Sequence, residues 1–140
     1  MPSVRWQCRA DGQYGIDVEL GHRHFTLVVD TGLIDRKNQV GFCIEPFLYD
    51  YLKNQGELSA FSMHSQMDAS SIVSTSESGL TTARLISPVT QLPIGPAVQL
   101  HVMRGSPNVP NRVGAVFFHH LKGCRVNWDL DNRIWSIDYP

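Results

Sequence analysis

Apolar and polar side chains alternate with a period of two residues through most of the chain, and turn-forming residues separate the alternating runs. The run Gln13–Leu20 has an apolar residue at every second position, which predicts a strand with one buried face. Gly21–His24 then connects it to Phe25–Val29, a more continuously apolar run, in a predicted antiparallel hairpin. Strand-like runs outnumber helical ones and no βαβ rhythm occurs. We therefore predict an all-β fold, a barrel or sandwich with one or two short helices.

Two segments have helical character. We expect a helix within Ile44–Gly56, because Pro46 suits a first helical turn and Gly56 suits the end. The face that this helix buries is predicted to consist of Phe47, Leu48, Tyr51 and Leu52. A second, short helix is predicted at Val116–Leu121.

Further strands are predicted in the second half of the chain. Ser70–Ile86 contains two strand-prone runs on either side of Ser76–Gly79, and the composition of this tetrapeptide predicts a mobile hairpin. Val89–Gly105 reads as strand interrupted by prolines, as at an edge or corner. The C-terminal segment predicts two strands around a turn at Asp131-Asn132. No tandem repeat or linker is present, so residues 1–140 are predicted to form one domain.

Composition excludes several classes of protein. With 12 basic and 13 acidic side chains and no basic run, the chain has no electrostatic support for binding nucleic acid. No apolar stretch approaches the roughly 20 residues of a membrane span, and the N-terminus lacks a signal-peptide pattern. Cys8, Cys43 and Cys124 are far apart and show no CxxC pairing. They predict reduced, mostly buried thiols in a cytoplasmic protein without a metal site or cofactor.

The most informative site is Asp30, which follows the apolar strand directly and begins the triplet Asp30-Thr31-Gly32. A carboxylate at the end of a buried strand must be solvated, paired or used chemically. One interpretation is that Asp30 caps its own turn, which is common for aspartate near glycine. The other is that Asp30 is a catalytic acid, and the residues further along the chain bear on that choice.

Several short motifs follow in a characteristic order. After the Asp-Thr-Gly triplet come a Ser/Gly-rich segment, the pair Val113-Gly114, and the segment Ala115–Asp138 with its short helix and closing strands. This order resembles the retropepsin-like aspartic protease family, over roughly Tyr14 to Ile137. The resemblance implies an acid-protease barrel with a flap hairpin, an aspartic endopeptidase activity, a polypeptide substrate and no cofactor.

The resemblance also implies an assembly. Aspartic proteolysis needs two carboxylates that share one proton, one acting as base on a water and the other as hydrogen-bond donor to the scissile carbonyl. The chain contains one Asp-Thr-Gly triplet and no Asp-Ser-Gly. A chain with one such acid must obtain the second from a symmetry mate, so we expect a homodimer with Asp30 at the axis. Glycine permits the tight turn, and in this family the threonine hydroxyl fastens one loop to its mate.

Other residues acquire roles from the resemblance. Gly79, with Ser78 and Leu80, is expected at the tip of the flap that closes over substrate. Asp35 is expected near the bound peptide backbone, and Gly114 behind the active-site loop. The chain ends Val4–Arg9 and Asn132–Tyr139 would form strands that interleave at the dimer interface.

Departures from the family pattern support a rival hypothesis. Leu33 stands where a small residue is usual and is expected to make the outer wall of the loop bulkier, and Ala115 replaces the arginine of viral members. The rival is a catalytically silent retropepsin-like module for dimerisation or peptide binding. Two Asp30 carboxylates sharing one water would favour catalysis, whereas splayed or arginine-capped carboxylates would favour the silent module. A third hypothesis, a β-barrel metalloenzyme, requires several of the six histidines to converge in one pocket.

Overall fold

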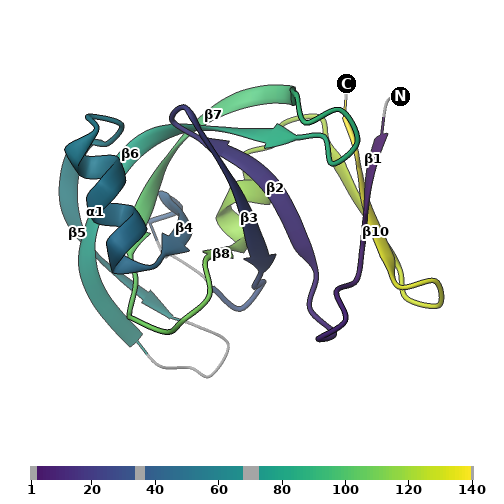
Figure 1. Ribbon diagram of the computed structural model, residues 1–140, viewed down its shortest axis with the longest axis horizontal. Coiled ribbons are helices and arrows are strands. Elements are labelled where there is room, and N and C mark those ends of the chain that lie inside the picture. Colours follow the sequence, from purple (N-terminus) through teal and green to yellow (C-terminus); the bar gives the residue numbers. More distant parts are fainter. Residues whose placement is uncertain (1–2, 34–36, 68–72, 140) are drawn as a thin grey trace.

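The computed structural model describes residues 3–33, 37–67 and 73–139. In this part of the chain it contains ten strands and two short helices, so the all-β prediction is confirmed. The elements are β1 Ser3–Gln7, β2 Gly15–Leu20, β3 Arg23–Val29, β4 Val40–Ile44, α1 Pro46–Asn54, β5 Ser59–Met67, β6 Val73–Ile86, β7 Pro93–Arg104, β8 Arg112–Val113, α2 Ala115–His119, β9 Arg125–Asp129 and β10 Ile134–Asp138. Figure 1 shows the strands wrapping around a central space that the side chains of the core fill.

Seven strands form the main sheet, in the order β2-β3-β8-β4-β7-β6-β5. An additional pairing of β2 with β6 closes this sheet on itself as a barrel. The predicted first hairpin is confirmed, since β2 and β3 are antiparallel from Gly15 opposite Val28 to Leu20 opposite Arg23. The short strand β8 lies between β3, to which it is parallel, and β4, to which it is antiparallel. This arrangement brings residues 112–113 beside the end of β3.

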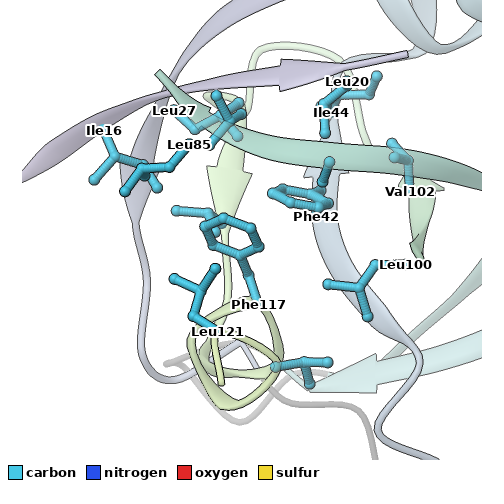
Figure 2. Packing of buried hydrophobic residues seen from close by; sticks show 14 of the residues in the cluster. Ile16, Leu20, Leu27, Phe42, Ile44, Leu85, Leu100, Val102, Phe117 and Leu121 are labelled. Carbon is cyan, nitrogen blue, oxygen red and sulfur yellow. The ribbon is translucent and has the colours of Figure 1, made fainter. Parts of the chain in front are cut away.

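The core lies inside the barrel (Figure 2). In β2 the alternation seen in the sequence has the expected result, because Ile16, Val18 and Leu20 are all fully buried. Phe42 of β4 and Phe117 of α2 pack together in the centre, with ring centroids 5.2 Å apart. Each such side chain contributes about 1.5–3 kcal/mol by leaving water. Helix α2 therefore packs into the interior of the barrel and holds the segment that precedes it in place.

A separate three-stranded sheet, in the order β1-β10-β9, joins the two ends of the chain. Its three tryptophans stack in sequence, with ring centroids 4.8 Å apart for Trp6–Trp135 and 5.3 Å apart for Trp135–Trp128. The indole Nε1 of Trp135 donates a hydrogen bond of 3.2 Å to the carbonyl oxygen of Gly15, which ties this sheet to the barrel. Within one chain the terminal strands thus pair with each other, and their interleaving with a second chain stays a prediction.

Helix α1 forms where the sequence predicts it, with Pro46 as its first residue. The prediction of its buried face was wrong in part. Tyr49 and Leu52 are the buried residues of the helix, whereas Phe47 is 78% exposed. The tyrosine is buried because its hydroxyl reaches a polar partner, Glu77 of β6, at 2.8 Å. The short helix predicted at Val116–Leu121 is present as α2, which begins one residue earlier and ends two residues earlier than predicted.

The prediction of a hairpin at Ser76–Gly79 was wrong. The antiparallel pair is β5 with β6, and the residues that connect these two strands lie outside the described part of the chain. Gly79 instead lies inside β6, opposite Val102 of β7. Its lack of a side chain serves packing, since a Cβ at this position would lie 2.8 Å from the Cβ of Leu58. Composition alone cannot distinguish a glycine needed for a turn from one needed for close approach.

Neither helix in the described ranges is long and apolar enough to cross a membrane.

Candidate active site

Asp30 follows the last residue of β3, and backbone hydrogen bonds fix its position. Its amide donates to the carbonyl oxygen of Val113 at 2.9 Å, which ties the end of β3 to β8. The amide of Leu33 donates to the Asp30 carbonyl oxygen at 3.0 Å and closes a turn. The amide of Gly32 donates to the Asp30 carboxylate oxygen Oδ1 at 3.1 Å. The carboxylate is therefore oriented by its own loop, and Thr31 at the outside of that loop is exposed in the single chain.

Gly114 supports this loop from behind. A Cβ atom on Gly114 would lie 2.5 Å from the carbonyl oxygen of Leu33, closer than real contacts allow. The amide of Gly114 donates to the carbonyl oxygen of Gly41 at 2.9 Å. Leu33 itself is only 2% exposed, so our expectation that it widens the outer wall of the loop was wrong. The leucine packs inward, where it holds the loop against the barrel.

Arg112 lies beside the carboxylate of Asp30. Its guanidinium Nη1 is 3.4 Å from Asp30 Oδ2, and the two side chains are 16% and 18% exposed. The other terminal nitrogen, Nη2, is 3.6 Å from the Sγ atom of Cys43. The remaining nitrogen, Nε, is buried and has no hydrogen-bond partner among the described residues. Asp30 is thus ion-paired within its own chain, which sequence analysis did not anticipate.

A signal for Arg112 was present in the sequence. The motif used for the resemblance is two apolar residues and a glycine, and only Val113-Gly114 matches it. The position before Val113 holds a basic residue in a strand next to β3. A charged side chain in place of an apolar one, beside a strand that ends in aspartate, indicates an ion pair.

The thiol of Cys43 completes this cluster. Burial raises its pKa, and the neighbouring Arg112 guanidinium opposes that shift. All three cysteines lie in described segments as free thiols, and Cys43 is the buried one. A raised pKa keeps the Cys43 sulfur protonated at neutral pH, so it is a poor nucleophile.

Ser78, Gly79 and Leu80, expected at the flap tip, lie inside strand β6, and their contact with substrate stays a prediction. The Ser78 side chain is fully buried and lies between two histidines, 2.7 Å from Nδ1 of His64 and 2.9 Å from Nδ1 of His101. A buried hydroxyl in this setting satisfies the hydrogen-bonding groups of its neighbours. Asp35 lies outside the described residues.

The histidines do not assemble a metal site in the part of the chain that is described, where no three or more His, Cys, Asp or Glu side chains lie suitably close together. His64 and His101 share Ser78, with their rings 5.0 Å apart. His22 pairs instead with Glu57 at 3.0 Å, and His24 with Glu19 at 3.5 Å, both near the β2–β3 turn. The metalloenzyme hypothesis therefore gains no support from these positions.

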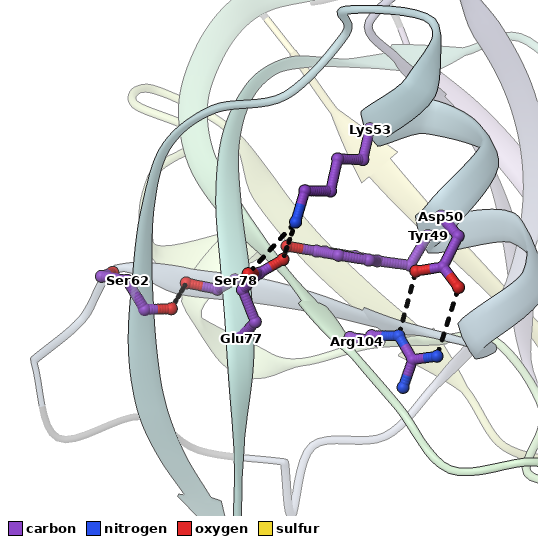
Figure 3. A network of polar contacts seen from close by, with 7 residues as sticks. All are labelled: Tyr49, Asp50, Lys53, Ser62, Glu77, Ser78 and Arg104. Atoms are coloured by element: carbon purple, nitrogen blue, oxygen red, sulfur yellow. Dashed lines mark hydrogen bonds and ion pairs between the residues drawn. The ribbon is translucent and has the colours of Figure 1, made fainter.

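A second polar network holds α1 against the barrel (Figure 3). Lys53 Nζ lies 2.9 Å from Glu77 Oε2, which also accepts the hydroxyl hydrogen of Tyr49. Arg104 of β7 pairs with Asp50 at 3.0 Å. The partners of these residues lie on α1, β6 and β7, so the network stabilises the scaffold and is separate from the Asp30 contacts.

Comparison with known proteins decides the fold. The structure is similar to a solved structure described as a retropepsin-like aspartic protease from Rickettsia conorii, with a TM-score of 0.55 and 15% sequence identity. The match covers 99% of this chain and 90% of that chain. The fold is retropepsin-like.

Sequence comparisons add no closer relative. No protein-family model and no curated protein matches the chain. At 15% identity the structural match supports the fold alone, so the chemistry must be inferred from the residues of the site.

Proposed function

We propose that the chain is an aspartic endopeptidase that acts as a homodimer. The observation that carries the proposal is the position of Asp30 in a retropepsin-like fold. The carboxylate follows β3 shortly after the buried residues Leu27 and Val28, in a turn whose Gly32 amide donates to it. Half of a symmetric catalytic pair would account for an aspartate at this position. The enzyme would cleave an extended polypeptide bound along the loops of both chains.

The mechanism uses two Asp30 carboxylates, one from each chain. Two carboxylates about 3 Å apart cannot both ionise easily, so together they hold one proton. The ionised member removes a proton from a water as it attacks the scissile carbonyl carbon, and the protonated member donates a hydrogen bond to the carbonyl oxygen. Thr31 fastens each loop to its mate, Gly114 keeps the loop in place from behind, and Asp35 contacts the peptide backbone. The titration belongs to the pair.

A specific observation favours a second candidate, a catalytically silent module for dimerisation or peptide binding. Arg112 is ion-paired with Asp30 in the single chain. A carboxylate that is held by a guanidinium is less available to its symmetry mate and to a catalytic water. If the contact persists in the dimer with substrate bound, the two carboxylates are not free to share a water.

The test is a digest of a peptide library by the wild type and by Asp30→Asn. The amide is nearly isosteric with the carboxylate, so folding and dimerisation should persist while cleavage is lost. Circular dichroism and sedimentation of the variant provide the folding and assembly controls. Cleavage by the wild type alone supports the peptidase. Equal cleavage by both proteins, or none by a folded dimeric wild type, overturns it.

A further inference from the structure

We propose that Arg112 selects substrates with an acidic side chain next to the scissile bond, and that it holds Asp30 until such a side chain arrives. The inference rests on the proposed peptidase and names its substrate class. It starts from the contacts of the Arg112 guanidinium, which no motif in the sequence assigned.

The guanidinium of Arg112 has weak partners. Arginine has five N–H donors and binds carboxylates best through two parallel hydrogen bonds of about 2.7–2.9 Å. Here one nitrogen lies 3.4 Å from Asp30, another lies 3.6 Å from a thiol, and Nε has no partner within the described segments. A carboxylate able to form both hydrogen bonds would therefore compete well with Asp30 for this cation.

Arg112 is also well positioned to meet a ligand. Its backbone is held in β8 between β3 and β4, opposite Val28 and Cys43, so the base of the side chain is fixed. The side chain retains 16% exposure beside an Asp30 side chain that retains 18%. A ligand that reaches the Asp30 carboxylate thus reaches the guanidinium as well.

Charge balance gives the contact a consequence for catalysis. A dimer would contain two Asp30 carboxylates and two Arg112 guanidinium groups, and each guanidinium would hold one carboxylate as it does in the single chain. The working pair must instead be free to bind a water between its two carboxylates. When a substrate carboxylate binds Arg112, the cation is neutralised by the substrate and its effect on Asp30 is reduced. A neutral side chain leaves the ion pair intact, so neutral peptides are cleaved slowly.

The experiment uses two decapeptide pools that are randomised except for one central residue, fixed as Glu in one pool and as Gln in the other. Wild type should cleave the Glu pool about tenfold faster or more, the scale of a charged hydrogen bond. Arg112→Gln should reduce that ratio to within about twofold and accelerate cleavage of the Gln pool. Arg104→Gln, which removes an arginine paired with Asp50 on α1, should retain the wild-type ratio. A wild type without preference, or an Arg112→Gln protein that retains it, overturns the inference.

Binding separates this inference from the proposed function. Asp30→Asn removes the anion that holds Arg112, so this inactive variant should bind labelled Glu peptides at least as tightly as wild type does, and more tightly than Gln peptides. Adding Arg112→Gln should abolish the difference, and Arg112→Lys should reduce it if the glutamine variant does not fold. Selective binding without cleavage by any protein would overturn the peptidase and leave carboxylate recognition standing. Cleavage without selective binding would overturn carboxylate recognition and leave the peptidase standing.

Discussion

Residue 114 and the Asp-Thr-Gly loop are in direct backbone contact, because a Cβ on Gly114 would lie 2.5 Å from the Leu33 carbonyl oxygen. The contact joins the segment that enters α2 to the loop that carries Asp30. Gly114 has a φ of −99°, which any residue adopts, so glycine is required here for space alone.

Gly114→Ala should therefore destabilise the protein and displace the loop. The added methyl group meets backbone, which cannot rotate away, so we expect a loss of about 1–3 kcal/mol in the free energy of unfolding. Urea denaturation measures the loss. Gly15→Ala is the matched control, because a Cβ there would have its nearest contact, again a carbonyl oxygen, at 3.4 Å. Equal stability of the two variants would contradict the close contact.

The lowered pKa of Glu77 predicts how the stability of the protein depends on pH. Hydrogen bonds from Lys53 and Tyr49 lower its pKa below the ordinary value of 4.5. A carboxyl with a lower pKa in the folded chain stabilises it at neutral pH, and this stabilisation is lost as the pH falls through the folded-state pKa. Glu77→Gln should thus lower the free energy of unfolding at pH 7, by less than about 1 kcal/mol because solvent screens the pair.

The difference between Glu77→Gln and wild type should shrink as the pH falls below about 4. Urea unfolding of both proteins at pH 7 and pH 3 measures it. A difference that grows in acid would show that the carboxylate does not have a lowered pKa in the folded protein.

Cys43 should resist alkylation in the folded protein. Its pKa is raised, chiefly by burial, and the residue is only 6% exposed. Iodoacetamide reacts with the thiolate, so at neutral pH modification should be many times slower than in urea. Mass spectrometry of peptides containing Cys43 gives the rate. Modification as fast in buffer as in urea would show that the Cys43 thiol, and with it that side of the Arg112 cluster, is accessible to reagent in the folded protein.

If the active unit is a dimer, cleavage should depend steeply on protein concentration. Below the dimer dissociation constant the specific activity should fall with dilution, because monomers contain one carboxylate each. Activity assays over a dilution series, together with sedimentation at the same concentrations, test this. Full specific activity in samples that sediment as monomers would exclude a shared site.

Much of the scaffold could be predicted from the sequence because its signals are local. The alternation in Gly15–Leu20 and the turn after it predict the antiparallel pair of β2 and β3, although β3 begins at Arg23, two residues earlier than predicted. Pro46 marks the start of α1, and Asp30 was identified as the residue of interest at the end of a buried strand. Each of these depends on neighbours within a few positions.

The errors arose where contacts are distant in sequence. Gly79 suggests a turn by its type, yet a glycine is needed there because the side chain of Leu58, which directly precedes the neighbouring strand β5, packs against it. Phe47 was expected inside on periodicity, but Tyr49 takes the buried position because Glu77 is available to its hydroxyl. The pairing of Arg112 with Asp30 joins residues 82 positions apart, so the basic residue before Val113 becomes informative only once β8 is known to lie beside β3.

Subunit mixing tests most directly whether Asp30 works as one half of a symmetric pair. Wild type and Asp30→Asn are mixed in equal amounts, well above the dimer dissociation constant, and left to exchange subunits before the rate of peptide cleavage is measured. If both carboxylates are required, about a quarter of the dimers are active, and the rate should be about a quarter of that of wild type at the same total protein concentration. A rate of about one half, or cleavage by Asp30→Asn alone, would contradict the shared site.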